Sequence, residues 1–333
     1  MIPAIANVFI IPPLLALLAS SVVIAVLVRT RFAALALDHP NQRSLHATPT
    51  PRLGGIGIIA GVAAAWCYSA TPIDSWLLVA LALLIGISLL DDVKNVGVVA
   101  RLFTHITSAL LATTAVFQAY GLWPALIATL ATVWMINLYN FMDGSDGLAG
   151  GMTVIGFGSY GVAALAGGDF SFAMVNLSVA TAAAGFLWFN FPPAKIFMGD
   201  IGAIPLGCLA AVFGIAGWSR GDWPPWFGVV VFSPFVIDAS FTLIKRLLRG
   251  AKIWQAHREH YYQRLVQSGW GHRKTAYVEY ALMLLCSLLA LAGMRQGQPA
   301  QIAVLGIVAL LYTGIILALE RHFSRHASGH AKT

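Results

Sequence analysis

The sequence contains little charge. Asp, Glu, Lys and Arg make up 10% of its 333 residues, whereas a soluble domain usually carries about 25%. Apolar residues make up 59%, and the mean hydropathy is +0.79. These values exclude an ordinary soluble globular protein and also a disordered chain, which requires low hydrophobicity. The composition favours an integral membrane protein.

Cysteine is also scarce. Cys67, Cys208 and Cys286 lie in separate apolar runs, and no CxxC pair occurs. This pattern argues against a disulfide framework or a zinc ribbon. No Ser–His–Asp triad or catalytic-cysteine setting is evident, and no linker or repeat divides the chain. We therefore expect a single membrane-embedded domain over residues 1–333, with no nucleic-acid partner.

Long apolar runs are abundant, and a membrane-spanning helix needs about 20 such residues. The runs predict an all-α, polytopic membrane bundle with about 11 transmembrane helices. The predicted spans are 6–29, 54–70, 76–90, 101–119, 123–140, 149–166, 171–188, 201–218, 225–248, 275–294 and 299–319.

The distribution of basic residues predicts the orientation. If the N-terminus is outside, only Arg220 and Arg295 of the twenty Lys and Arg residues fall in outer segments. Cytoplasmic segments are enriched in Lys and Arg, so the C-terminus is predicted to be cytoplasmic. The polar motifs lie between residues 38 and 274, and a flexible tail is expected over about 322–333.

The first inner segment, DHPNQRSLHATPTPRLGG at residues 38–55, is proline- and glycine-rich. Arg43, His46 and Arg52 suit an anion-binding loop beside a helix N-terminus, where free N–H groups favour phosphate. Anchoring by the positive-inside rule is the alternative. The glycines that follow, Gly54, Gly57 and Gly61, favour close packing of helices.

The second segment, DDVKNV at 91–96, ends an apolar helix with two acids. Neighbouring helical residues point about 100° apart, so Asp91 and Asp92 face different partners. One partner is a metal, and the other is a substrate or Lys94. A solvated helix end is the alternative.

The third and fourth segments contain most of the remaining acids and amides. In NLYNFMDGSDGLAGG, residues 137–151, Asn137, Asn140 and Asp143 share one face if the helix extends that far. FNFPPAKIFMGDIGA, residues 189–203, places Asn190 and Asp200 on either side of a proline turn. A simple helix N-cap is the alternative for Asp200.

The fifth segment, residues 249–274, includes HREHYYQRLVQSGWGHR. His257, His260 and Arg264 fall on one face of a predicted helix and suit the gripping of phosphate oxygens. An amphipathic surface helix is one alternative. Half of a zinc site is another, but a third strong ligand is missing.

Together these segments place carboxylates, amides and cations on one membrane face. Hard oxygen ligands without thiolates point to Mg²⁺, with Mn²⁺ as the alternative. Metal-binding acids beside cationic donors are the parts that phosphoryl transfer needs. A site on the inner face suits a water-soluble nucleotide donor and a lipid acceptor.

The five segments, in order, resemble the motifs of the polyprenyl-phosphate N-acetylhexosamine-1-phosphate transferases, of the glycosyltransferase family 4 type. RSLHATPTPRLGG, DDVKN, NLYNFMDGSDGLAGG, FNFPPAKIFMGDIGA and HREHYYQRL carry the resemblance, which covers about residues 38–265. It implies a bacterial inner-membrane enzyme with a cytoplasmic site. Its partners would be a UDP-N-acetylhexosamine, undecaprenyl phosphate and membrane lipids, with a homodimer left open.

The resemblance also implies roles. The residues expected to act in catalysis are Asp91, Asp92, Asp143, Asp146, His257 and His260. The residues expected to bind substrate are Arg43, His46, Arg52, Lys94, Asn137, Asn140, Asn190 and Arg264. The residues expected to bind Mg²⁺ are Asp200, Asn190 and Asp92.

The implied reaction is attack of the lipid phosphate on the β-phosphorus of the UDP-sugar, with release of UMP. A one-step route is favoured over an aspartyl-phosphate intermediate, because a phosphate dianion is already a nucleophile. HREHYYQRL lacks a run of consecutive histidines and looks more like the O-antigen-initiating branch than the peptidoglycan branch. Its donors include UDP-GlcNAc and UDP-deoxysugars.

Two other functions remain as alternatives. A proton-coupled transporter would place acids near the membrane midplane, and Asp238 is the one candidate within an apolar run. A phosphotransferase of the CDP-alcohol type would gather its acids in one compact motif. Here the acids are spread over three segments.

Overall fold

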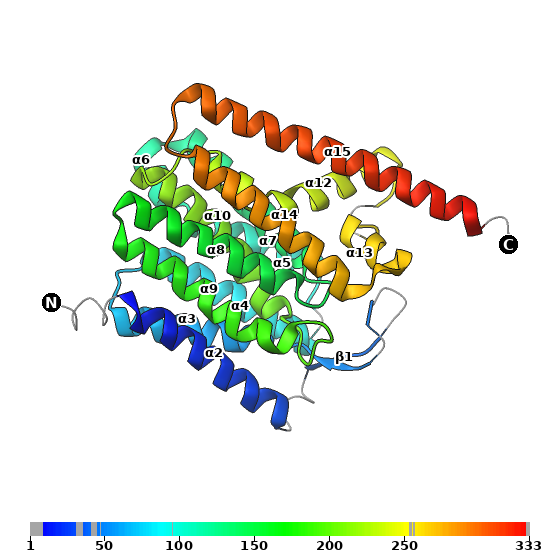
Figure 1. Cartoon of the computed structure of the whole chain (residues 1–333). Helices are drawn as coiled ribbons and strands as arrows, with labels where there is room; N and C mark the ends of the chain where they lie inside the picture. Colours follow the sequence, from blue (N-terminus) through cyan, green and yellow to red (C-terminus); the bar gives the residue numbers. More distant parts are fainter. Residues whose placement is uncertain are drawn as a thin grey trace.

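The computed structural model describes residues 9–30, 36–40, 45–46, 48–94, 96–252, 255 and 257–330. This part of the chain is almost entirely helical, as predicted. Figure 1 shows the helices side by side, with α2 (Ile11–Arg29) and α15 (Gln298–His330) at opposite edges of the bundle. The other α-helices are α3 (Gly54–Ser69), α4 (Ser75–Lys94), α5 (Val98–Ala112), α6 (Thr114–Tyr120), α7 (Leu122–Met142), α8 (Leu148–Gly167), α9 (Phe170–Asn190), α10 (Asp200–Arg220), α11 (Phe227–Val231), α12 (Ser233–Leu248), α13 (Tyr261–Leu265) and α14 (Gly271–Gly293).

Two short features, a pair of strands and a π-helical turn, were not predicted. A two-residue strand β1 (Leu37–Asp38) pairs antiparallel with β2 (Thr50–Pro51) in the first motif segment. A π-helical turn, Val266–Trp270, separates α13 from α14. Both elements are too short to give a hydrophobic period, which is why pattern alone does not predict them.

Each predicted span overlaps a helix. By length and apolar composition, seven helices in the described ranges qualify as membrane-spanning, and the bent pair α5–α6 would make eight. Helix α3 and the Ser75–Asp91 part of α4 are apolar but shorter. The structure therefore supports a polytopic bundle, while the count of eleven and the orientation stay predictions. Helix α15 also continues to His330, through most of the segment expected to be a flexible tail.

Two predicted spans are broken. The 101–119 span bends by 46° between α5 and α6. At this point the Thr113 hydroxyl lies 2.8 Å from both the Ala109 carbonyl oxygen and the Thr129 hydroxyl, and such back-bonding bends helices. The 225–248 span is divided into α11 and α12, where Pro234 occupies the first turn of α12. Proline in this place begins a helix but cannot continue one.

Small residues allow the N-terminal helices to approach closely, as predicted. A β-carbon on Gly57 would collide with Ile24 of α2, and one on Gly61 would collide with the Ala16 carbonyl oxygen. A β-carbon on Gly55 would collide with the backbone of Gly202 in α10. These contacts fix α3 between α2 and α10, and so they fix the first motif beside the fourth.

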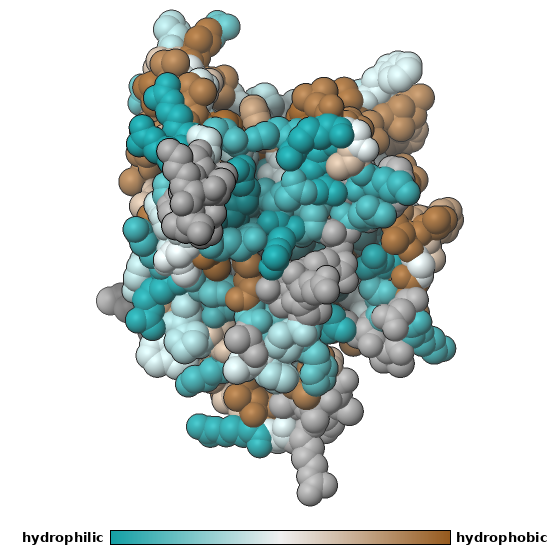
Figure 2. Space-filling view, turned by 90° about the vertical axis from the view of Figure 1, so that its right-hand side faces the viewer, coloured by the Kyte–Doolittle hydropathy of each residue, from teal (hydrophilic) through white to brown (hydrophobic). Residues whose placement is uncertain are grey.

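The motif segments gather at one end of the bundle, called here the motif end. It contains β1, α13 and the C-terminal part of α15, at the right of Figure 1. Figure 2 views this end directly and shows a face dominated by hydrophilic residues, with apolar residues towards its margin. The opposite end contains the turns around residues 70–74, 167–169 and 220–222.

Candidate functional site

A cleft of about 370 Å³ opens at the motif end between α5, α7, α10 and the segment that precedes α13. It brings together predicted residues of the third and fifth motifs. Its lining consists of Val98, Arg101, Leu102, His105, Asn137, Asn140, Phe141, Ile204, Gln255, His257, His260 and Gln263. Such a concave site with convergent polar groups is the usual form of a small-molecule site.

Arg101 links two of the predicted acids to this cleft. Its Nη1 atom lies 2.8 Å from Asp91 Oδ2 and 3.7 Å from Asp200 Oδ2. Asp91 comes from the end of α4 and Asp200 is the first residue of α10. The buried hydroxyl of Ser88 donates to the Asp200 carbonyl oxygen at 3.3 Å and ties the two helices together.

Asp143 lies close to Asp200. It follows the last turn of α7, and its backbone N–H donates to the Asn140 carbonyl oxygen. Burial raises the pKa of Asp143 well above its usual value, the nearby Asp200 carboxylate raises it further, and the Gly199 backbone opposes the rise. Two carboxylates forced together in this way would be relieved by a bound cation.

The turn before α10 requires glycine. Gly199 has φ 70°, and a β-carbon there would collide with the Arg52 carbonyl oxygen. The Phe197 N–H donates to Pro51 O at 2.7 Å, and the Gly54 N–H donates to Phe197 O at 2.9 Å. The first motif therefore supports the backbone that presents Asp200.

The predicted cations of the first motif lie near this support. The Arg52 N–H donates to Ala36 O at 2.9 Å. His46 packs its ring against Phe197, with centroids 4.9 Å apart. Neither residue lines the cleft. The predicted Arg43 lies outside the described residues.

Asn190 and Asp146 hold the third motif against the fourth. The buried Asn190 accepts the Gly147 N–H and donates to Ile196 O, each at 2.9 Å. Asp146 Oδ2 accepts the Ala194 N–H at 3.0 Å. Both halves of the Asn190 amide are thus engaged within the protein. The two side chains position the acid-bearing loops and do not line the cleft.

The fifth motif does not form the predicted helical face. His257 lies in a segment without regular secondary structure, and His260 is the N-cap residue of the short helix α13. The reason is Asp238, whose two carboxylate oxygens accept the N–H groups of Tyr261 at 2.9 Å and Tyr262 at 3.0 Å. These bonds start the helix at Tyr261, after both histidines.

His260 and Arg264 consequently face different surroundings. His260 is buried, and its Nδ1 lies 3.3 Å from Asp238 Oδ1. Arg264 points away from the cleft, because it pairs with Glu320 at 3.2 Å and stacks 3.9 Å from the Phe323 ring centroid. The structure therefore brings the two histidines to the cleft but not Arg264.

The charge state of His257 follows from its neighbours. Burial, with smaller contributions from His260 and Arg246, lowers the pKa of its imidazole to about 4, and Asp238 opposes this shift. A neutral imidazole can donate one hydrogen bond to a phosphate and can take up a proton when an anion arrives. This behaviour suits a site that receives a charged substrate.

The remaining predicted residues are divided between two places. Asn137 and Asn140 line the cleft, although Asn137 Nδ2 also donates to Val133 O at 2.7 Å in its own helix. Lys94 is exposed in the last turn of α4 and does not line the cleft. The side chain of Asp92 lies outside the described part of the structure.

The sequence interpretation missed two residues. It treated Arg101 only as a positive-inside residue, although its place at the start of the span after Asp91 and Asp92 is a usable signal. It considered Asp238 only for the transporter alternative, because the acid lies within an apolar run. In the fold Asp238 accepts the Tyr261 N–H and lies beside His260, so it belongs to the structure that supports the fifth motif.

The donors present near the cleft decide whether a metal ion fits there. Within the described ranges, no group of three or more His, Cys, Asp or Glu side chains is arranged around a common point. Mg²⁺ usually takes only one or two carboxylates and completes its shell with phosphates and water. The crowded acids Asp143 and Asp200 fit that requirement.

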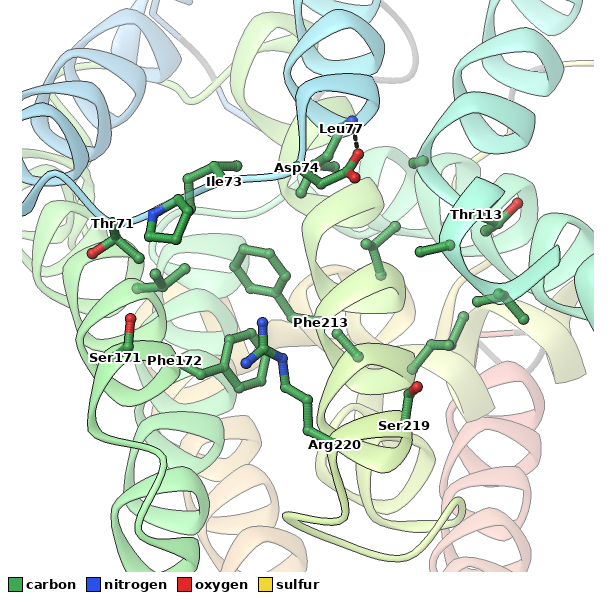
Figure 3. Close-up of a pocket in the computed structure, with 18 residues that line it drawn as sticks. Thr71, Ile73, Asp74, Leu77, Thr113, Ser171, Phe172, Phe213, Ser219 and Arg220 are labelled. Atoms are coloured by element: carbon green, nitrogen blue, oxygen red, sulfur yellow. Dashed lines mark hydrogen bonds between the residues drawn. The ribbon is translucent and has the colours of Figure 1, made fainter. Parts of the chain in front are cut away.

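A second cavity, of about 530 Å³, lies at the opposite end (Figure 3). Arg220 stacks 4.9 Å from the Phe172 ring centroid and pairs with Asp169 at 2.8 Å. Asp74 caps α4 by accepting the Leu77 N–H at 2.9 Å. None of the predicted motif residues lines this cavity, so it is not the site that the motifs predict.

The chain is similar to known membrane transferases. The profile of glycosyl transferase family 4 matches residues 75–218. A probable undecaprenyl-phosphate N-acetylglucosaminyl 1-phosphate transferase of Bacillus subtilis is 30% identical, covering 77% of this chain and 76% of its own length. A decaprenyl-phosphate N-acetylglucosaminephosphotransferase of Mycolicibacterium smegmatis is 30% identical, covering 87% and 83%. A phospho-N-acetylmuramoyl-pentapeptide-transferase of Desulforamulus reducens is also 30% identical, covering 84% and 92%.

Proposed function

Because the chain belongs to the polyprenyl-phosphate N-acetylhexosamine-1-phosphate transferases of glycosyl transferase family 4, we propose that it transfers an N-acetylhexosamine-1-phosphate from a UDP-sugar to undecaprenyl phosphate and releases UMP. The observation that carries this proposal is Arg101, which joins Asp91 and Asp200 at the wall of the cleft. Acids held by a fixed cation, beside a cleft lined with amides, are what phosphoryl transfer requires.

The acceptor phosphate attacks the β-phosphorus of the donor, the bond between that phosphorus and the UMP oxygen breaks, and the sugar C1–O bond survives. Mg²⁺, when bound by Asp200 with Asp143 nearby, would neutralise charge on the diphosphate. Asp91 positions the attacking phosphate and accepts any proton that it still carries. Arg101 holds the Asp91 carboxylate in place, because its guanidinium lies 2.8 Å from it.

The amide and imidazole side chains of the cleft bind the donor. Asn137 and Asn140 face the nucleotide, and His257 and His260 donate to the diphosphate or the sugar. Asp238 orients the His260 ring at 3.3 Å. Asn190 and Asp146 act indirectly, because their bonds to Gly147 and Ala194 hold the loops that carry the acids.

We place the cleft on the cytoplasmic side of a bacterial inner membrane, from the excess of basic residues in the predicted inner segments. We assign the enzyme to the first membrane step of O-antigen and lipopolysaccharide synthesis, from HREHYYQRL in the fifth motif. Relatives of both the GlcNAc and the muramoyl-pentapeptide type match at 30% identity, so the donor sugar must be measured.

The test is release of UMP by the purified protein from undecaprenyl phosphate, Mg²⁺ and a panel of UDP-sugars, with and without EDTA. UMP that appears with one donor and disappears with EDTA supports the reaction, the metal and that sugar. UMP release that persists in EDTA would contradict the metal assignment. Absence of UMP with every donor, from protein that elutes as a folded species, would contradict the proposed reaction.

A further inference from the structure

A second polar pocket lies at the motif end, on the side of α13 away from the cleft. Its volume is about 600 Å³, and α12, α13, α15 and the segment before α13 form its walls. Charged side chains dominate its lining. They are the cations Lys245, Arg249, Arg258 and Arg264 and the acids Glu259 and Glu320. We call it the cationic pocket.

Positive charge is in excess here. Lys245 and Arg264 share one carboxylate oxygen of Glu320, at 2.5 Å and 3.2 Å. Glu259 is likewise shared, because it pairs with Arg249 at 3.2 Å and also with Arg246. A group with several acceptor oxygens and negative charge would balance this surplus, and phosphate has both properties.

The surroundings indicate a lipid as the source of the phosphate. On α12, Leu247 and Leu248 are 61% and 82% exposed, and they stand one to three residues from Lys245 and Arg249. Exposed leucines beside basic residues at the end of a helix suit the boundary between acyl chains and headgroups. Basic pockets beside such surfaces bind anionic headgroups. We therefore expect phospholipid headgroups beside the cationic pocket.

Helix α13 connects the cationic pocket with the cleft. The Tyr261 hydroxyl donates to Glu320 Oε1 at 2.8 Å in the pocket. The N–H of the same residue donates to Asp238, which also lies beside His260. A ligand that fixes Glu320 and Arg264 thus acts on the residue next to a cleft histidine.

We propose that the cationic pocket binds the phosphate of an anionic phospholipid headgroup, and that the bound headgroup stabilises α13 in the position that holds His260. The binding is independent of the proposed transferase reaction. The effect on activity rests on that reaction.

The first test measures binding by native mass spectrometry of the delipidated, detergent-solubilised full chain. Dioleoyl phosphatidylglycerol and dioleoyl phosphatidylcholine are the probes, alone and against inorganic phosphate. We expect preferential retention of phosphatidylglycerol. The Arg249→Gln/Arg258→Gln variant should retain it about thirtyfold more weakly, since each of the two basic residues near a membrane surface contributes about 1 kcal/mol. Arg29→Gln, an exposed cation at the end of α2, is the matched control and should retain the lipid like the parent protein.

Equal retention of the two lipids, or full retention by the double variant, would overturn the proposal. Phosphate that binds in place of the lipid, without any lipid preference, would also overturn it and assign the pocket to free anions. If the double variant elutes as an aggregate, Arg258→Gln alone serves, because that side chain is exposed.

The second test follows UMP release while phosphatidylglycerol is titrated at saturating undecaprenyl phosphate. We expect kcat to rise with the lipid in the parent protein and in Arg29→Gln, and not in the double variant. A rise in the double variant, or a lower KM for undecaprenyl phosphate with unchanged kcat, would contradict a role through α13. If no UMP is formed under any condition, the binding result still stands or fails by itself.

Discussion

The two ends of the bundle each contain an arginine–aspartate ion pair, and the two pairs have the same N–O distance. Arg101 and Asp91 at the motif end, and Arg220 and Asp169 at the opposite end, are each 2.8 Å apart, and each arginine lines a cavity. Arg101 also approaches Asp200. Arg220 instead stacks on Phe172 (Figure 3). An arginine–aspartate pair beside a cavity is therefore not by itself a sign of chemistry. At the motif end the arginine also approaches a second acid, and its cleft is lined by two asparagines and three histidines.

The strongest test of this contrast is Asp200→Asn against Asp74→Asn. We expect Asp200→Asn to lower kcat by about 10³-fold with folding intact, because a cation-binding charge at the reacting phosphate is lost. Asp74 only caps α4, and asparagine caps as well as aspartate, so its variant should retain activity. The measurement is UMP release by both variants after matched size-exclusion profiles. An active Asp200→Asn enzyme would remove the metal assignment.

The arginines provide the next test. Arg101→Gln should lower kcat by about 10²-fold, because one fixed donor at a charged site is lost. Arg220→Gln should leave kcat unchanged and shift stability by at most about 1 kcal/mol, since the Arg220 side chain is 53% exposed. Kinetics and thermal melts in detergent measure both effects. Equal losses of kcat in the two variants would mean that the two ends of the bundle do not differ in their importance for catalysis.

A smaller effect is expected at Asp238. Asp238→Asn replaces one acceptor oxygen with a donor facing the N–H of Tyr261 or Tyr262. A buried N–H left without an acceptor costs about 1–3 kcal/mol, and kcat should fall about tenfold as His260 loses its orientation. Asp169→Asn is the control, because asparagine preserves the cap on α9. Unchanged kcat in Asp238→Asn would show that His260 needs no such support.

The smallest effect concerns pH. The pKa of His257 falls from 6.5 to about 4 in the folded protein, so between these values the unfolded chain binds more protons and stability drops as pH falls. At the opposite end, burial and Asp169 raise the pKa of Asp222, while Arg220 and Arg295 oppose the rise. There the folded state binds more protons, and stability drops as pH rises through the raised pKa.

Melting temperatures across this range measure the two contributions. His257→Gln should reduce the loss of stability on the acid side, and Asp222→Asn should reduce the loss on the side of higher pH. If both substitutions change the profile in the same direction, the opposite signs of the two pKa shifts are wrong.

Much of the fold follows from local pattern. Apolar length predicts a helix at every expected span, and Gly57 and Gly61 predict close packing. The bend at Thr113 was not predictable in the same way, because it depends on a hydroxyl contact with Thr129 across helices. The helical face expected for His257, His260 and Arg264 failed for a similar reason. Asp238, distant in sequence, decides where α13 begins.

The sequence predicts which residues meet at the cleft better than it predicts what each residue contacts there. Asn137, Asn140, His257 and His260 meet in one cleft, as their motifs suggest. The sequence alone does not show that the Asn190 side-chain oxygen and nitrogen are both hydrogen-bonded, to Gly147 and Ile196. The residue type determines which hydrogen bonds a side chain can form. Only the fold shows which partner it actually contacts.

The backbone contacts of Pro51 and Gly54 with Phe197 have a consequence for biosynthesis. Helices α2 and α3 leave the ribosome long before residue 197 is made. During translation the first motif loop therefore lacks its hydrogen-bond partner, Phe197. The loop that presents Asp200 is closed only when the middle of the chain has been inserted. A nascent chain halted before Phe197 would contain the first three motifs but would lack the backbone contacts that join the first motif to the fourth.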